Sequence, residues 1–171
     1  MRLSRAFLPG LAIAAVIVVL DQLSKWWVVE VVMNPPRTIE VTSFFNLVMG
    51  WNRGVSFGLF NTGSAVTEWL LPAVAAVIII VLTVWLSRVD RLLLGAALGS
   101  IIGGALGNVI DRLRYGAVAD FLDVHAMGYH WPAFNLADTM ITVGAAVLII
   151  DSLFVRAEPA KRRQGNERKK R

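Results

Sequence analysis

Two stretches decide the fold, Leu92–Ile110, LLLGAALGSIIGGALGNVI, and Trp69–Ser87, WLLPAVAAVIIIVLTVWLS, because neither contains a charged side chain. A helix rises about 1.5 Å per residue, so each stretch would reach about 28 Å, close to the roughly 30 Å of bilayer hydrocarbon. Of the 171 residues, 56% are hydrophobic and 17% are charged, against roughly 45–50% and about 25% in soluble domains. Both stretches are therefore predicted to span a membrane.

Two further apolar segments extend this pattern. The N-terminal segment resembles a cleavable signal peptide, but its small-residue triplet Ala12–Ala14 comes too early and more apolar residues follow it. We therefore predict an uncleaved first span. The predicted fold is an all-α membrane protein with one membrane-embedded domain, residues 1–155, and four transmembrane helices at about residues 6–29, 69–87, 92–110 and 133–155.

Two local patterns add detail to this architecture. Within about residues 37–60, β-branched and aromatic residues occur among glycines that permit turns, which predicts a small extracytoplasmic β-sheet between the first two helices. In the third span, glycines recur every four residues and predict close helix packing rather than chemistry. They are Gly95, Gly99, Gly103 and Gly107.

Basic charge is concentrated in the tail, Arg156–Arg171, of a chain whose formal net charge is +5. We interpret the tail as a cytoplasmic topology anchor near anionic lipid rather than as a segment that binds nucleic acid. Four alternating helices would bring it to the same side as the other basic residues at the span ends. Both termini are therefore predicted to be cytoplasmic, from this tail together with Arg2, Arg5, Arg88 and Arg91.

Polar residues are predicted to converge at the opposite, outer end of the spans. Charges at such depths are costly unless they are paired or functional. Asp21 and Lys25, four residues apart, can neutralise each other, and Asp111 with Arg112 can anchor a helix end. We therefore expect both pairs to support a site. The full set is Asp21, Lys25, Asn108, Asp111, Arg112, Asn135 and Asp138, with Asp120 in the loop after the third span.

Asp120 and Asp138 differ from the other carboxylates because no adjacent cation neutralises them. Of two carboxyl groups in an apolar environment, one is expected to stay protonated while the other is ionised, which suits the activation of water for peptide hydrolysis. Two alternatives stay open at this point. Asp123 competes as the partner in such a pair, and either carboxyl could be a packed structural group.

Other catalytic chemistries have weaker support. The chain contains no cysteine, which excludes disulfides, thiolate metal sites and a cysteine nucleophile. His125 and His130 alone are a weak case for zinc. Gly54–Gly58 matches the letters of the G-x-S-x-G nucleophile elbow but lacks the parallel sheet that this elbow requires. We therefore expect neither a metal nor another cofactor.

Five short motifs occur in order along the chain: DQLSK at 21–25, NRGVSFG at 52–58, GNVIDR at 107–112, VADF at 118–121 and FNLAD at 134–138. With these motifs, the chain resembles bacterial lipoprotein signal peptidases, also called signal peptidase II, over about residues 7–154. The resemblance implies an aspartyl endopeptidase of the bacterial cytoplasmic membrane with its active site at the extracytoplasmic face. Its substrate would be a prolipoprotein, cut before a cysteine that carries diacylglyceryl.

The resemblance also assigns roles to residues of this chain. The catalytic pair of the family falls on Asp120 and Asp138. The sheet, with Asn52 and Arg53 beside the flexible Gly54, is expected to clamp an extended signal peptide by strand addition. The implied partners are the lipidated prolipoprotein and membrane lipid, and we expect a monomer. Supporting or substrate-contacting roles fall on Asp21, Lys25, Asn52, Gly54, Asn108, Asp111, Arg112, Asn135 and Ala137.

The alternative hypothesis is a proton-coupled transporter or channel subunit, since carboxylates inside membranes often relay protons. Transport sites usually lie near the bilayer midplane between repeated halves. The predicted carboxylates lie at one face instead, and the chain has no internal repeat. A helical assembly factor without enzymatic activity is a third hypothesis.

Overall fold

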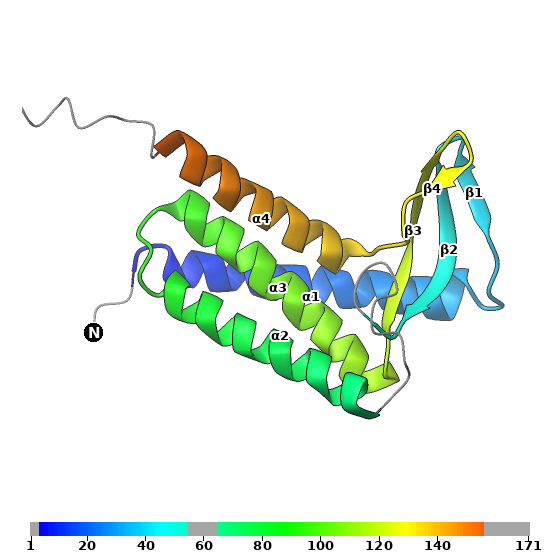
Figure 1. The fold of residues 1–171 in the computed structure, drawn as a ribbon, viewed down its shortest axis with the longest axis horizontal. Helices are drawn as coiled ribbons and strands as arrows, with labels where there is room; N and C mark the ends of the chain where they lie inside the picture. Colours follow the sequence, from blue (N-terminus) through cyan, green and yellow to red (C-terminus); the bar gives the residue numbers. More distant parts are fainter. Residues whose placement is uncertain (1–3, 55–64, 156–171) are drawn as a thin grey trace, which may run out of the picture.

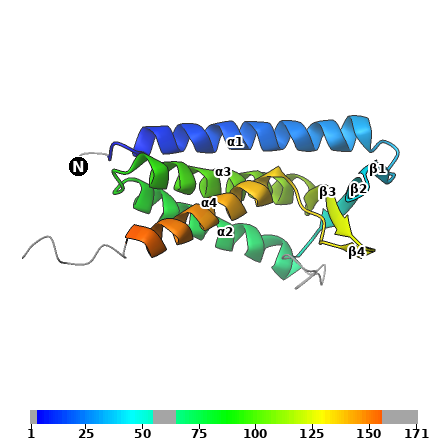
Figure 2. The same ribbon diagram turned by 90° about the horizontal axis from the view of Figure 1, so that it is seen from above.

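The helix α3 (Leu92–Tyr115) lies at the centre of the helix bundle. The computed structural model describes residues 4–54 and 65–155, with only the backbone for residues 65–68 and 155. In it, α3 packs against α1 (Phe7–Trp27), α2 (Ala65–Leu86) and α4 (Leu136–Val155). Successive helices run in opposite directions (Figure 1, Figure 2). All four are long and apolar enough to cross a membrane, which confirms the predicted fold class.

The helix ends differ from the predicted spans by a few residues. α1 continues as a π-helical turn, η1 (Val28–Val32). α3 continues past Ile110 and is terminated by Gly116, whose left-handed backbone, with φ of 68°, lets its N–H bond to the carbonyl of Arg112. α4 begins only at Leu136, after the capping residue Asn135. Because α3 extends to Tyr115, Asp111 and Arg112 lie inside this helix and not in the connection that follows it.

The glycine stripe of α3 faces α1. A Cβ atom on Gly95 would lie 2.6 Å from the Cβ of Ala6, and one on Gly103 would lie 2.6 Å from the carbonyl oxygen of Ala14. Both distances are too short for any larger residue unless the helices move apart. The predicted role of the stripe in close packing is confirmed.

A four-stranded antiparallel sheet crosses the end of the bundle where α1 and α3 end and α2 and α4 begin (Figure 1). Its order is β1 (Ile39–Thr42), β2 (Phe45–Asn52), β3 (Val118–Ala126) and β4 (Tyr129–His130). The sheet predicted after the first helix is therefore present. Residues 55–60 of the predicted sheet segment lie outside the described part of the chain.

Half of the sheet was not predicted, because β3 and β4 come from the connection after α3. The prediction that Asp120 lies in a loop is wrong, since Asp120 lies within β3. Residues 118–121 are all buried. The segment therefore shows none of the alternation of apolar and polar residues that reveals a half-buried strand.

The ladder between β2 and β3 changes register within β2. Pairing as far as Leu47 with Leu122 follows one register, and pairing from Gly50 with Asp120 onward follows another. The two residues between Leu47 and Gly50 therefore oppose a single residue of β3, which is a β-bulge. Continuing the first register would put the side chain of Asn52 on the opposite face from that of Asp120. The bulge brings the two side chains to one face.

Candidate active site

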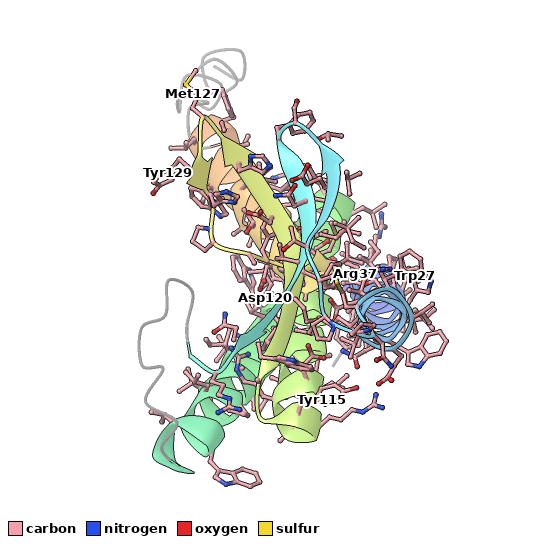
Figure 3. The ribbon with its side chains drawn as sticks, turned by 90° about the vertical axis from the view of Figure 1, so that its right-hand side faces the viewer. Trp27, Arg37, Tyr115, Asp120, Met127 and Tyr129 are labelled. Carbon is pink, nitrogen blue, oxygen red and sulfur yellow. The ribbon has the colours of Figure 1, made fainter. Side chains whose placement is uncertain are left out.

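The polar residues singled out in the sequence meet where the sheet covers the end of the bundle. Figure 3 labels Asp120 on β3, near the middle of the view. Most of these residues are buried despite being polar. Groups buried in this way are expected to be hydrogen-bonded, and here they form one network. Its buried members are Asp21, Lys25, Asn108, Asp111, Asp120 and Asn135.

Asp120 accepts hydrogen bonds from two side-chain amides. The Nδ2 of Asn135 lies 2.7 Å from its Oδ1, and the Nδ2 of Asn52 lies 3.0 Å from its Oδ2. Burial, followed by the proximity of Asp138, raises the pKa of Asp120 from 3.8 to about 6, against the lowering effect of these hydrogen bonds. Asp120 therefore holds a proton at pH values where an ordinary aspartate is ionised.

Asp138 lies in the first turn of α4 and forms a reciprocal cap with Asn135. The N–H of Asp138 donates to the Oδ1 of Asn135 at 2.9 Å, and the N–H of Asn135 donates to the Oδ2 of Asp138 at 3.3 Å. This is the capping-box arrangement, with Asp138 at the third helical position. The Nδ2 of Asn108 donates to the other carboxylate oxygen at 2.8 Å. Asp138 is thus fixed by the start of its own helix and by α3.

Lys25 is a buried cation at the base of this network. Its Nζ lies 2.9 Å from Asp21, 2.9 Å from Asp111 and 2.9 Å from the Oδ1 of Asn108, so all three of its donors are used. The predicted neutralisation of Asp21 by Lys25 is confirmed. The second carboxylate partner, Asp111, was missed because it comes from a different helix and no local spacing indicates it.

The sequence grouped Arg112 with Asp111 as residues that can anchor a helix end, and the structure gives the two side chains separate partners. The guanidinium of Arg112 donates to the carbonyl oxygen of Gly54 at 3.2 Å and to that of Asn108 at 3.4 Å. The N–H of Gly54 in turn donates to the Oδ1 of Asn52 at 3.1 Å. Arg112 therefore connects α3 to the end of β2. Arg53 is exposed, and no described contact ties its side chain to the site.

Asp123 is separated from the candidate pair. It lies three positions along β3 from Asp120, so its side chain projects from the other face of the strand. It bonds to Nδ1 of His130 at 2.9 Å and to Nδ2 of Asn46 at 3.0 Å. Although burial opposes ionisation, these hydrogen bonds lower the pKa of Asp123 below 3.8. Its carboxyl group is committed within the sheet.

Both Asp120 and Asp138 line one cavity of about 580 Å³. Strand β2, the segment before α4 and one face of α4 form its walls. The α4 face contributes Thr139, Thr142 and Val143. These residues were not singled out in the sequence, because threonine and valine are common in membrane helices and indicate no site by themselves. The other lining residues are Gly50, Trp51, Asn52, Trp131, Pro132, Ala133 and Phe134.

Gln22 is a further residue that the sequence reasoning passed over. Its Nε2 donates to the Oδ1 of Asp111 at 2.9 Å and to the carbonyl oxygen of Gly107 at 3.2 Å. Its only signal in the sequence was its place between Asp21 and Lys25.

Across the described residues, no group of three or more His, Asp or Glu is arranged to hold a metal ion. Most of the Gly54–Gly58 segment, including Ser56, lies outside the described residues.

Comparison with known proteins identifies the family. The sequence profile described as signal peptidase (SPase) II matches residues 13–154. The lipoprotein signal peptidase of Methylorubrum extorquens (strain PA1) is 46% identical over 151 residues, which cover 86% of this chain and 87% of that protein. That of Burkholderia vietnamiensis (strain G4 / LMG 22486) is 46% identical over 151 residues, covering 88% and 90%.

Two solved structures share the fold. Each is described as a bacterial membrane enzyme determined by the in meso method, at 2.3 Å and 1.9 Å resolution. Their TM-scores are 0.80 and 0.76 and their sequence identities 28% and 30%, over 94% and 90% of this chain and 97% of each of theirs. These relatives do not support the transporter or channel alternative. The chain belongs to the signal peptidase II family.

Proposed function

We propose that Asp120 and Asp138 are the catalytic pair with which this membrane-embedded signal peptidase II removes signal peptides from prolipoproteins, cutting before the diacylglyceryl-modified cysteine. One observation carries the proposal. The two carboxyl groups, from β3 and α4, line the same cavity and share Asn135 as a hydrogen-bond partner. Relatives named lipoprotein signal peptidase supply the reaction to which this geometry is matched.

In the proposed reaction, the Asp138 carboxylate takes a proton from water as the water oxygen attacks the scissile carbonyl carbon. Asp120 donates its proton to the leaving amine as the carbon–nitrogen bond breaks. Asp120 is assigned the acid role because burial and the neighbouring Asp138 raise its pKa to about 6. Two carboxyl groups that share one proton are sufficient for both transfers.

Substrate is proposed to enter along β2 and α4. β1 pairs with β2 only as far as Leu47, so the rest of that edge of β2 has no strand partner among the described residues. An extended peptide segment can add there by main-chain hydrogen bonds, beside Gly50 and Asn52, which line the cavity. The exposed Arg53 follows directly and is assigned to contact the signal peptide. The acyl chains remain in the bilayer beside α4.

We also propose that both termini are cytoplasmic and that the site faces the outer surface of the bacterial cytoplasmic membrane. Arg5, Arg88 and Arg91 flank helix ends at the opposite end of the bundle from the sheet (Figure 1). The N–H of Arg5 bonds to Asp90 at 3.2 Å, which keeps these connections together. Basic residues favour the cytoplasmic side. A periplasm-dependent phosphatase fused after Arg171 should be inactive, and one fused after Asn34 should be active.

The test of the function uses purified protein without any added partner. A synthetic prolipoprotein peptide with a diacylglyceryl cysteine should be cleaved by the wild-type enzyme, in the presence of a strong chelator as well as in its absence. We propose that a monomer suffices, because one chain supplies both carboxyl groups. Absence of cleavage by well-folded wild-type protein would reject the function, and chelator sensitivity would reject the metal-independent aspartyl pair.

A further inference from the structure

Thr142 is a polar residue at a membrane depth where an unpaired polar side chain costs free energy. It lies on α4, one turn beyond Asp138, and its side chain is exposed to the cavity that holds both carboxyl groups. Four residues of helix place it about 6 Å further from the sheet than Asp138. Apolar residues such as Val143 and Phe134 line the same cavity. A hydroxyl group in such surroundings requires a hydrogen-bond partner.

Thr142 differs from the other hydroxyl residues of the helices. A serine or threonine in a membrane helix commonly donates to a backbone carbonyl of its own helix. Among the Ser and Thr side chains that are described in the four helices, only Thr142 makes no such bond. The others all do: Ser24 to Asp21, Thr83 to Ile79, Ser100 to Ala96, Thr139 to Asn135 and Ser152 to Ile149.

The contrast with Thr139 is informative because both residues line the same cavity. The hydroxyl of Thr139 lies 2.9 Å from the carbonyl oxygen of Asn135, so it is committed to the first turn of α4. The hydroxyl of Thr142 is left available to whatever fills the cavity. An unsatisfied polar group at membrane depth costs free energy that a bound acceptor can recover.

We propose that the Thr142 hydroxyl donates a hydrogen bond to an ester carbonyl of the diacylglyceryl group and makes Thr142 a specificity-determining residue for lipidated substrates. This inference rests on the proposed function. With the scissile bond at Asp120 and Asp138, the modified cysteine carries its glyceryl esters toward the hydrocarbon, in the direction in which α4 runs. Ester carbonyls are the acceptors that a lipidated substrate brings to the depth of Thr142, and an unlipidated peptide lacks them.

The test compares two substrates and four enzymes. The substrates are one prolipoprotein peptide with either two acyl esters or two alkyl ethers on the glyceryl group, because the ether form keeps the chains and lacks the carbonyl oxygens. The enzymes are the wild type, Thr142→Val, Thr142→Ser and the control Thr83→Val, whose hydroxyl bonds within α2 at 2.7 Å. Thr142→Ala serves as a second variant in case the valine form is poorly folded.

Loss of one neutral hydrogen bond should raise KM for the ester substrate about three- to tenfold in Thr142→Val. The value of kcat should stay nearly constant, because the bond is made equally in the ground and transition states. The ether substrate should show no difference between wild type and Thr142→Val. Thr142→Ser should restore the KM for the ester, and Thr83→Val should behave as wild type.

Three outcomes would overturn the inference. An equal effect of Thr142→Val on the ester and ether substrates would mean that the hydroxyl binds the peptide instead. No effect on either substrate would mean that the hydroxyl has no role in recognition. In both cases the wild-type enzyme still cleaves, so the proposed function survives. A folded wild-type enzyme that cleaves neither substrate would reject the function and this inference together.

Discussion

The Asp21 carboxylate accepts a hydrogen bond of 3.0 Å from the backbone N–H of Ala137, the residue directly before Asp138. Asp111 does the same for the other half of the site, accepting from the N–H of Ala119, directly before Asp120, at 3.1 Å. Lys25 lies between the two carboxylates. One buried cation therefore sets the positions of the strand that carries Asp120 and the helix that carries Asp138.

Replacing Lys25 with methionine should destabilise the fold strongly. The substitution leaves Asp21 and Asp111 as buried carboxylates without a cation, and breaking a buried ion pair in this way typically costs about 3–5 kcal/mol. Thermal unfolding of the purified protein in detergent measures the effect. The control is Arg91→Gln, which breaks the more exposed 2.6 Å ion pair to Asp151 and should cost about 1 kcal/mol or less.

A second variant separates charge from packing. Lys25→Met combined with Asp21→Asn and Asp111→Asn removes the uncompensated charges and should recover part of the lost melting temperature. If the triple variant were no more stable than Lys25→Met, the loss would come from packing, and the charge explanation would be wrong.

Asp120→Asn and Asp138→Asn should each lower the rate of cleavage by several powers of ten. Each substitution keeps the size of the side chain but removes a group that can take up or release a proton. The melting temperature should fall little in comparison with Lys25→Met. Asp123→Asn is the matched control, since Asp123 bonds to His130 and Asn46 on the other face of β3, and most of its activity should remain. Substantial turnover by either Asn variant of the pair would remove that residue from catalysis.

The pH profile should report the protonation of Asp120. Its pKa is about 6 in the folded protein, above the ordinary aspartate value of 3.8. If the protonated form is the acid, kcat/KM should decline as the pH rises through about 6. The same difference in pKa makes folded-state stability fall as the pH rises from 3.8 toward 6, because the native state binds the proton more tightly than the unfolded state.

The Asn52→Ala variant tests whether Asp120 is the group whose pKa sets the decline of kcat/KM at alkaline pH. The amide of Asn52 stabilises the ionised form of Asp120, so its removal should raise the pKa and move the alkaline limb to higher pH. Asn46→Ala, which loses a similar bond to Asp123, should leave the limb in place. A shift of the limb to lower pH in Asn52→Ala would exclude Asp120 as the group that titrates.

The sequence predicts the helices well and the sheet only in part, for a physical reason. A charge-free segment long enough to cross a bilayer is rare in a soluble domain, so Trp69–Ser87 and Leu92–Ile110 were recognisable as membrane spans. β3 escaped because it is buried along residues 118–121 and has no alternation. Its pairing with β2 joins two connections that are separated by two helices, and no local pattern encodes such a contact.

The residues of the site were predictable, but their contacts were not. Depth along the helices was enough to bring Asp21 and Asp138 to one level, since helical rise is constant. The spacing of Lys25 from Asp21 also predicted their ion pair. By contrast, the bonds from Asp21 to Ala137 and from Asp111 to Ala119 join a side chain to a backbone N–H. Any residue except proline supplies such an N–H, so the sequence carries no mark of the partner.

Gly50 should be sensitive to any added side chain because it pairs with Asp120 across the ladder. A Cβ atom there would lie 3.2 Å from the carbonyl oxygen of Asp120 and 3.9 Å from its Cβ. Gly50→Ala should displace β3 slightly and reduce kcat, and Gly50→Val should reduce it further, by up to about a hundredfold if Asp120 moves by about 1 Å. Val41→Ala on the exposed edge strand β1 is the control and should keep wild-type turnover. Single-turnover cleavage of the lipidated peptide, with melting temperatures measured in parallel, distinguishes displacement of Asp120 from unfolding. Wild-type kcat in Gly50→Val would show that the backbone clearance opposite Asp120 has no part in positioning the carboxyl group.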